Sequence, residues 1–136
     1  MEFSFPDSHF WATVGGGVED GEDLLCAVWR EVYEETGWTE NDINLSQLPI
    51  FHHESEGIDC GVPTLFVDTF FVAQLKNDEV KIDRSSLTKE EQSIITSYKW
   101  WSLMEIQTTQ DVIYPGILAE FFEKAVLMKE SGNLFS

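Results

Sequence analysis

The segment between Gly16 and Trp38 restricts the fold of this chain more than any other part of its sequence. Consecutive glycines interrupt regular structure at its start, and helical periodicity then runs over residues 23–36. Gly37 follows at the position where a glycine commonly ends a helix in a left-handed backbone conformation. The sequence therefore predicts a loop that leads directly into a helix with a defined end.

Three glutamates gather on one side of this predicted helix. With about 100° of rotation per residue, Glu31, Glu34 and Glu35 share one side. The apolar side consists of Leu24, Leu25, Val28, Trp29 and Val32. Like charges at this spacing repel each other, and the dipole at a helix C-terminus disfavours anions. A divalent cation would reverse the repulsion, because carboxylate oxygens are ligands that Mg²⁺ and Mn²⁺ prefer. A solvated acidic face is the alternative.

The order of residues in this segment resembles the signature of the Nudix hydrolase family. The pattern G-x5-E-x7-R-E-V-x-E-E-x-G-W is matched at Gly16, Glu22, Arg30, Glu31, Val32, Glu34, Glu35, Gly37 and Trp38. Nine specified positions within 23 residues make the match highly specific. The preceding aromatic residues are also similar to the strand that usually enters this signature in the family.

The resemblance implies a fold and an activity. The expected fold is α/β, an α/β/α sandwich with a mixed β-sheet and a shortened N-terminal strand region, and residues 1–136 are expected to form a single domain. The expected activity is hydrolysis of a nucleoside diphosphate linked to another group, by attack of water at phosphorus and with Mg²⁺ or Mn²⁺. The alternative is a non-catalytic module of the same fold that binds nucleotides or regulates. Intact Glu31, Glu34 and Glu35 argue against it, because degenerate members of the family usually lose these acids.

The resemblance also implies roles for single residues. Glu34 and Glu35 correspond to the main metal ligands, and Glu31 corresponds to a ligand or base. The expected metal-binding residues are Glu31, Glu34, Glu35 and the carbonyl of Gly16. Arg30 and Glu22 correspond to a structural pair that braces the loop against the helix, and Gly37 is the helix-ending glycine of the signature.

A general base often lies outside the signature in this family. Many members carry an acidic residue about nine places before an aromatic pair, and Glu91 precedes Trp100 by nine places. We therefore expect Glu91 to be the base, with Glu90, Glu54 and Glu56 as alternatives. A surface position without a catalytic role is the other interpretation of Glu91. The expected catalytic residues are Glu31, Glu34, Arg30 and Glu91.

The net charge limits the partners of this chain. With 25 acidic residues against eight lysines and arginines, the formal charge is −17, which repels DNA, RNA and anionic membrane surfaces. We therefore expect a small nucleotide-type substrate and no nucleic acid duplex or membrane. The sequence shows no stretch near the roughly 18 apolar residues that a membrane helix needs, and its start lacks a basic leader pattern. A cytoplasmic location is expected. The shortened N-terminal region has three interpretations: a lost edge strand, a truncated start, or a homodimer in which a partner covers the sheet.

Periodicity outside the signature predicts interleaved helices and strands. Further helices are expected at residues 88–95 and 115–130, and extended segments at residues 3–14, 48–54, 64–75, 80–82 and 97–103. The almost continuous apolar run in residues 64–75 predicts burial on both faces of that strand. Candidates for substrate contacts, with ordinary packing or surface roles as the alternative, are Phe10, Trp11, Phe51, His52, His53, Lys99 and Arg84.

Overall fold

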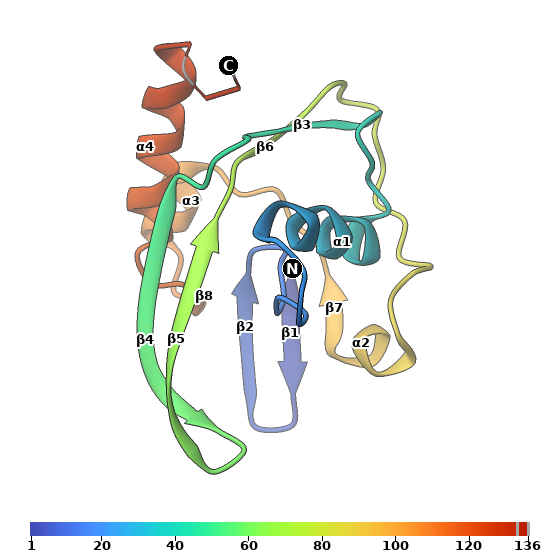
Figure 1. The fold of residues 1–136 in the computed structure, drawn as a ribbon, viewed down its shortest axis with the longest axis vertical. Coiled ribbons are helices and arrows are strands. Elements are labelled where there is room, and N and C mark those ends of the chain that lie inside the picture. Colours follow the sequence, from blue (N-terminus) through green and yellow to red (C-terminus); the bar gives the residue numbers. More distant parts are fainter. Residues whose placement is uncertain (133, 136) are drawn as a thin grey trace.

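Four strands form a mixed β-sheet that contains the first residues of the chain (Figure 1). The computed structural model describes residues 1–132 and 134–135. The strands are β1 (Glu2–Phe5), β2 (Ser8–Ala12), β7 (Ile95–Ser97) and β8 (Ile113–Tyr114), in the order β7-β1-β2-β8. The β1–β2 hairpin and the β1–β7 pair are antiparallel, whereas β2 and β8 are parallel. Together with four helices, this sheet confirms the predicted α/β class with a mixed sheet.

Helix α1 (Leu24–Thr36) begins and ends as the sequence predicts. The carboxylate of Asp23 accepts a hydrogen bond from a backbone N–H of the first turn at 2.8 Å and so caps the N-terminus. At the other end, Gly37 has a φ of 76°, and its N–H donates to the carbonyl of Tyr33 at 2.8 Å. This left-handed conformation favours glycine and gives the helix a sharp C-terminus.

The long hairpin of β4 (Phe51–Asp59) and β5 (Val62–Phe70) departs from the prediction for residues 64–75. The two strands pair with each other along their full length. Leu65 and Val67 are 56% and 55% exposed, so the expected burial on both faces is wrong. The apolar run does form a strand, but among the described residues this strand pairs with β4 alone, and the expected cover by helices on both faces is missing at these positions.

Two further connections hold this hairpin in the molecule. The short strands β3 (Ile43–Leu45) and β6 (Ala73–Leu75) precede and follow the hairpin in the sequence, and they pair with each other antiparallel. Helix α4 (Leu118–Glu130), which the sequence predicts within residues 115–130, packs against the base of the hairpin (Figure 1). The ring of its buried Phe121 stacks on Phe51 with a centroid distance of 3.9 Å and lies 5.1 Å from the ring of Phe70.

The segment after β7 also differs from the prediction. A strand is expected over residues 97–103, but β7 stops at Ser97, and α3 begins shortly afterwards and covers Leu103–Thr108. The hydroxyl of Ser102 accepts from the N–H of Glu105 at 3.1 Å, and the Glu105 carboxylate accepts from the N–H of Ser102 at 3.1 Å. This capping box starts the helix just after the aromatic residues, and residues 98–102, where the aromatic content favours a strand, have no regular structure.

Of the remaining short elements, one agrees with the prediction and one does not. Helix α2 (Lys89–Ile94) agrees with the helical turns expected over residues 88–95, and it begins with a second capping box between Thr88 and Glu91. Residues 80–82, expected to be an edge strand, have no regular structure. Both outcomes follow from local hydrogen bonding, because a capping box stabilises even a short helix whereas an edge strand needs a neighbour.

A small apolar core joins these elements to α1. Its buried members are Met1, Leu87 and Ile95, and Phe3, Val14, Ile94 and Tyr98 pack against them. The hydroxyl of Tyr98 also donates to the carbonyl of Glu35 at 2.6 Å, which ties the last turn of α1 to the segment after β7. Within the described residues, none of the helices combines the length and apolar character needed to cross a bilayer.

Candidate active site

Arg30 connects the glycine loop to the acidic side of α1. Its Nε and Nη2 donate to the two carboxylate oxygens of Glu22 at 2.8 and 2.9 Å, and Nη2 also donates to the carbonyl of Gly17 at 2.8 Å. Its Nη1 donates to Oε1 of Glu31 at 2.8 Å and reaches Oε2 of Glu34 at 3.4 Å. The guanidinium holds the pKa of Glu22 at about 2. A planar fork with five donors suits this arrangement, and a lysine ammonium could not reproduce it.

Glu31 lies directly against the glycine loop. Burial raises its pKa, the hydrogen bond from Arg30 opposes that rise, and the neighbouring carboxylates of Glu34 and Glu91 add to it. A Cβ atom built on Gly16 would lie 2.3 to 2.6 Å from the carboxyl group of Glu31. Gly16 is therefore needed for its small size, because its missing side chain leaves the space that the Glu31 carboxylate fills.

Substitution of Gly16 should separate this steric effect from general loop effects. We expect Gly16→Ala to displace the Glu31 carboxylate and to lower the catalytic rate roughly 10- to 100-fold, the range seen when groups that support a catalytic ligand are removed. The melting temperature should change little, because the displaced atoms are the end of a side chain. Gly17→Ala is the matched control, since a Cβ there meets no atom within 4 Å. Equal activities of the two variants would contradict the steric argument.

Glu35 is the most deeply buried acid of the cluster. It is 3% exposed, and its Oε1 accepts a hydrogen bond from the N–H of Gly15 at 2.9 Å. Burial raises its pKa to about 8, the bond from Gly15 opposes the rise, and the carboxylates of Glu31 and Glu91 contribute further to it. A carboxyl group in this setting lacks a positive partner strong enough to offset its loss of water.

Glu34 and Glu91 complete the acidic group from two different helices. The side chain of Glu34 is 40% exposed. Glu91 lies half-buried on α2, and its Oε1 accepts from the N–H of Thr88 at 3.2 Å. Its carboxylate lies within electrostatic range of Glu31 and Glu35 and adds to the rise of both pKa values. The alternatives Glu90, Glu54 and Glu56 are exposed.

The carboxylates of the cluster do not converge on one point. Within residues 1–132 and 134–135, no group of three or more His, Cys, Asp or Glu side chains is arranged to hold a metal ion. Glu31 turns to Arg30, and Glu35 turns to the N–H of Gly15. The structure therefore gathers the glutamates of the signature around Arg30 and the glycine loop, where each accepts a hydrogen bond from a protein donor: Glu22, Glu31, Glu34 and Glu35.

The two cations proposed from the sequence as substrate contacts both have protein partners, and Lys99 also lines the larger of the two cavities described below. The ammonium of Lys99 lies 3.0 Å from a carboxylate oxygen of Glu105 and 3.9 Å from the centre of the Trp101 ring. Arg84 donates to the carbonyl of Ile95 and lies over the ring of Tyr98. Both residues therefore stabilise the segment around β7, and no sequence signal separates this role from phosphate binding.

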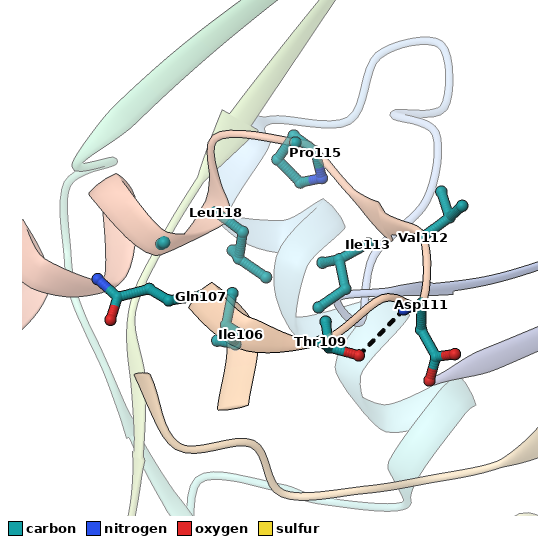
Figure 2. Close-up of a pocket in the computed structure, with 10 residues that line it drawn as sticks. Ile106, Gln107, Thr109, Asp111, Val112, Ile113, Pro115 and Leu118 are labelled. Carbon is teal, nitrogen blue, oxygen red and sulfur yellow. Dashed lines mark hydrogen bonds between the residues drawn. The ribbon is translucent and has the colours of Figure 1, made fainter. Parts of the chain in front are cut away.

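Two cavities differ in their relation to the acidic cluster. One of about 1080 Å³ is lined by residues 15–18, Glu31 and the tryptophans Trp11, Trp38, Trp100 and Trp101. The other, of about 500 Å³, lies among α3, β8 and the start of α4, with Ile106, Ile113 and Leu118 in its walls (Figure 2). Its described lining residues include none of the expected site residues. The larger cavity, which Gly16 and Glu31 line, is therefore the candidate binding site.

Comparison with known proteins matches most of this chain to one family. The family model described as NUDIX domain matches residues 3–121. The RNA pyrophosphohydrolase of Aliivibrio salmonicida (strain LFI1238) is 27% identical over 135 residues, which cover 90% of this chain and 76% of that protein. The RNA pyrophosphohydrolase of Vibrio cholerae serotype O1 gives the same values. That of Actinobacillus pleuropneumoniae serotype 5b is 28% identical over 131 residues, covering 89% of this chain and 62% of that protein.

Proposed function

The chain belongs to the Nudix family, and from this premise we propose that it is a metal-dependent pyrophosphohydrolase that cleaves a nucleoside diphosphate linked to another group. The family and the names of its relatives support a hydrolase of phosphoanhydride bonds. The observation that carries the proposal is the acid cluster of Glu31, Glu34 and Glu35 at one end of α1, held beside the glycine loop by Arg30. A module that only binds nucleotides would not need this concentration of negative charge, which a single arginine compensates only in part.

The family implies a divalent metal ion, and the chemistry of the site fits one. The carboxylates of Glu31, Glu34 and Glu35 and the carbonyl of Gly16 are the hard oxygen donors that Mg²⁺ or Mn²⁺ prefers. Burial raises the pKa of Glu31 and of Glu35, so both would gain from a nearby cation in their charged forms. Bound to these groups, the ion would offset phosphate charge and lower the pKa of a water molecule.

The residues of the chain perform the remaining tasks of the proposed reaction. Arg30 fixes Glu31 and the carbonyl of Gly17 in one network, so the loop and the acids move together. Glu91 accepts the proton of the attacking water, since its bond with Thr88 uses only Oε1. The water oxygen forms a new bond to phosphorus, the bridging P–O bond breaks, and the leaving phosphate departs with the electron pair. Positioning and charge neutralisation are the main demands of such a step.

The net charge of the chain limits the substrates that it can bind. We propose a small nucleotide-type substrate, because a net charge of −17 disfavours long nucleic acids. The relatives are named for RNA, so a 5′-triphosphorylated oligonucleotide belongs among the candidates as well. We further propose a cytoplasmic enzyme with a single domain over residues 1–136 that forms a homodimer.

A panel of substrates tests this function. We expect phosphate or pyrophosphate release from at least one nucleotide among nucleoside triphosphates, nucleoside diphosphate sugars, dinucleoside polyphosphates and 5′-triphosphorylated RNA. Release should require Mg²⁺ or Mn²⁺ and stop when a chelator is added. Tight nucleotide binding without release on the whole panel would instead support the non-catalytic module.

A further inference from the structure

Two tryptophans form a stack in the wall of the large cavity. The rings of Trp38 and Trp100 lie 6.0 Å apart between centroids, with an angle of 12° between their planes. The indole N–H of Trp38 donates to the carbonyl of Lys81 at 3.1 Å, which fixes the position of the Trp38 ring. Trp100 is nevertheless 70% exposed, so one face of its ring covers Trp38 and the other remains open. Its ring is therefore accessible to a ligand, and an aromatic ring stacks on a flat aromatic partner.

Both tryptophans are connected to the last turn of α1, which carries Glu34 and Glu35 of the acid cluster. Trp38 follows Glu35 by three residues, directly after the glycine that ends α1. Trp100 follows Tyr98 by two residues, and the hydroxyl of Tyr98 donates to the carbonyl of Glu35. Both rings line the cavity that Glu31 and the glycine loop also line. A molecule whose phosphates lie at the loop would therefore have its remaining part beside these rings.

We propose that the open face of Trp100 is the platform on which the aromatic base of the nucleotide substrate stacks. This inference rests on the proposed function, and it adds to it the group that recognises the nucleoside. Every base offers a π face, so stacking selects for the presence of a base and tolerates its identity. The platform predicts an enzyme that prefers nucleotides over base-free diphosphates and discriminates weakly among the four bases.

Equilibrium binding with analogues that resist hydrolysis tests the platform independently of turnover. The probes are methylene-bridged diphosphates of adenosine, guanosine, cytidine and uridine, with methylenediphosphonate as the base-free probe. We expect Trp100→Ala to weaken all four nucleotide analogues roughly 10- to 100-fold and to leave the base-free probe unaffected. Trp100→Phe, which retains a ring, should restore most of the affinity. Tyr33→Ala, at an exposed aromatic of α1 outside the described cavity lining, is the matched control and should change neither.

The outcomes separate the two proposals. Unchanged nucleotide affinity in Trp100→Ala, or an equal loss for the base-free probe, would overturn the platform. The same holds if the wild-type protein binds nucleotide analogues no better than methylenediphosphonate, or if the substitution changes only the oligomeric state. Binding that behaves as expected in a protein without turnover on the substrate panel would uphold the platform and reject the hydrolase.

Discussion

Glu34→Gln is expected to abolish measurable turnover while the fold stays intact. The substitution removes one negative charge from the acid cluster and keeps the size of the side chain. Loss of a group that stabilises charge in the reaction typically costs about 10²- to 10³-fold in rate, and we expect at least this loss. The side chain is 40% exposed, and its only hydrogen bond among those described is the 3.4 Å contact with Arg30. Little of the stability of the protein therefore depends on it.

Steady-state kinetics on the best substrate of the panel, together with thermal unfolding, checks this expectation. The melting temperature should stay within about 3 °C of the wild-type value, because an exposed ion pair contributes little to folding. Glu40→Gln, at an exposed position just beyond α1, is a control with the same chemical change and no place in the cluster. Undiminished activity of Glu34→Gln would remove Glu34 from the proposed metal ligands.

The sequence predicts the two ends of α1 well because their signals are local. Asp23 at the N-terminus and Gly37 at the C-terminus act within one turn. Spacing alone does not predict which side is buried, because Ala27 and Glu35 are buried whereas Leu24 is 43% exposed.

The β4–β5 hairpin shows the same limit. Its apolar composition predicts a strand, but the exposure of Leu65 and Val67 depends on which other elements cover that strand. Such coverage is a tertiary property that the periodicity of one segment does not contain.

The candidate site also combines features that the sequence predicts with features that it does not. The spacing of Arg30 and the glutamates on one helix predicts their proximity. The structure also brings Glu22 and the glycine loop, which precede the helix in the sequence, into contact with Arg30. The near-complete burial of Glu35 and the stack of Trp38 on Trp100 were not predicted. Both depend on the segment after β7, which packs against α1 from more than 60 residues away, as the separation of 63 between Tyr98 and Glu35 shows.

Without metal, the protein should lose stability as the pH rises from about 5 to 8. The pKa of Glu35 is raised from 4.5 to about 8 by burial, so in this window the folded state keeps a proton that the unfolded state releases. Each pH unit then costs about 1.4 kcal/mol, and the whole window costs on the order of 4–5 kcal/mol. Glu22 and Glu2, whose pKa values are lowered to about 2, act in the opposite direction but only below pH 4.5.

Unfolding by urea at several pH values in the presence of a chelator measures this dependence. Glu35→Gln should remove most of the slope and should exceed the wild-type protein in stability at pH 8, because the amide resembles the protonated acid. Added Mg²⁺ should restore stability to the wild-type protein at pH 8 and have little effect on Glu35→Gln, since a cation favours the charged carboxylate. Glu120→Gln, at an exposed position of α4, should follow the wild-type curve. A metal-free wild-type protein that is equally stable at pH 5 and pH 8 would show that Glu35 remains ionised in its buried position.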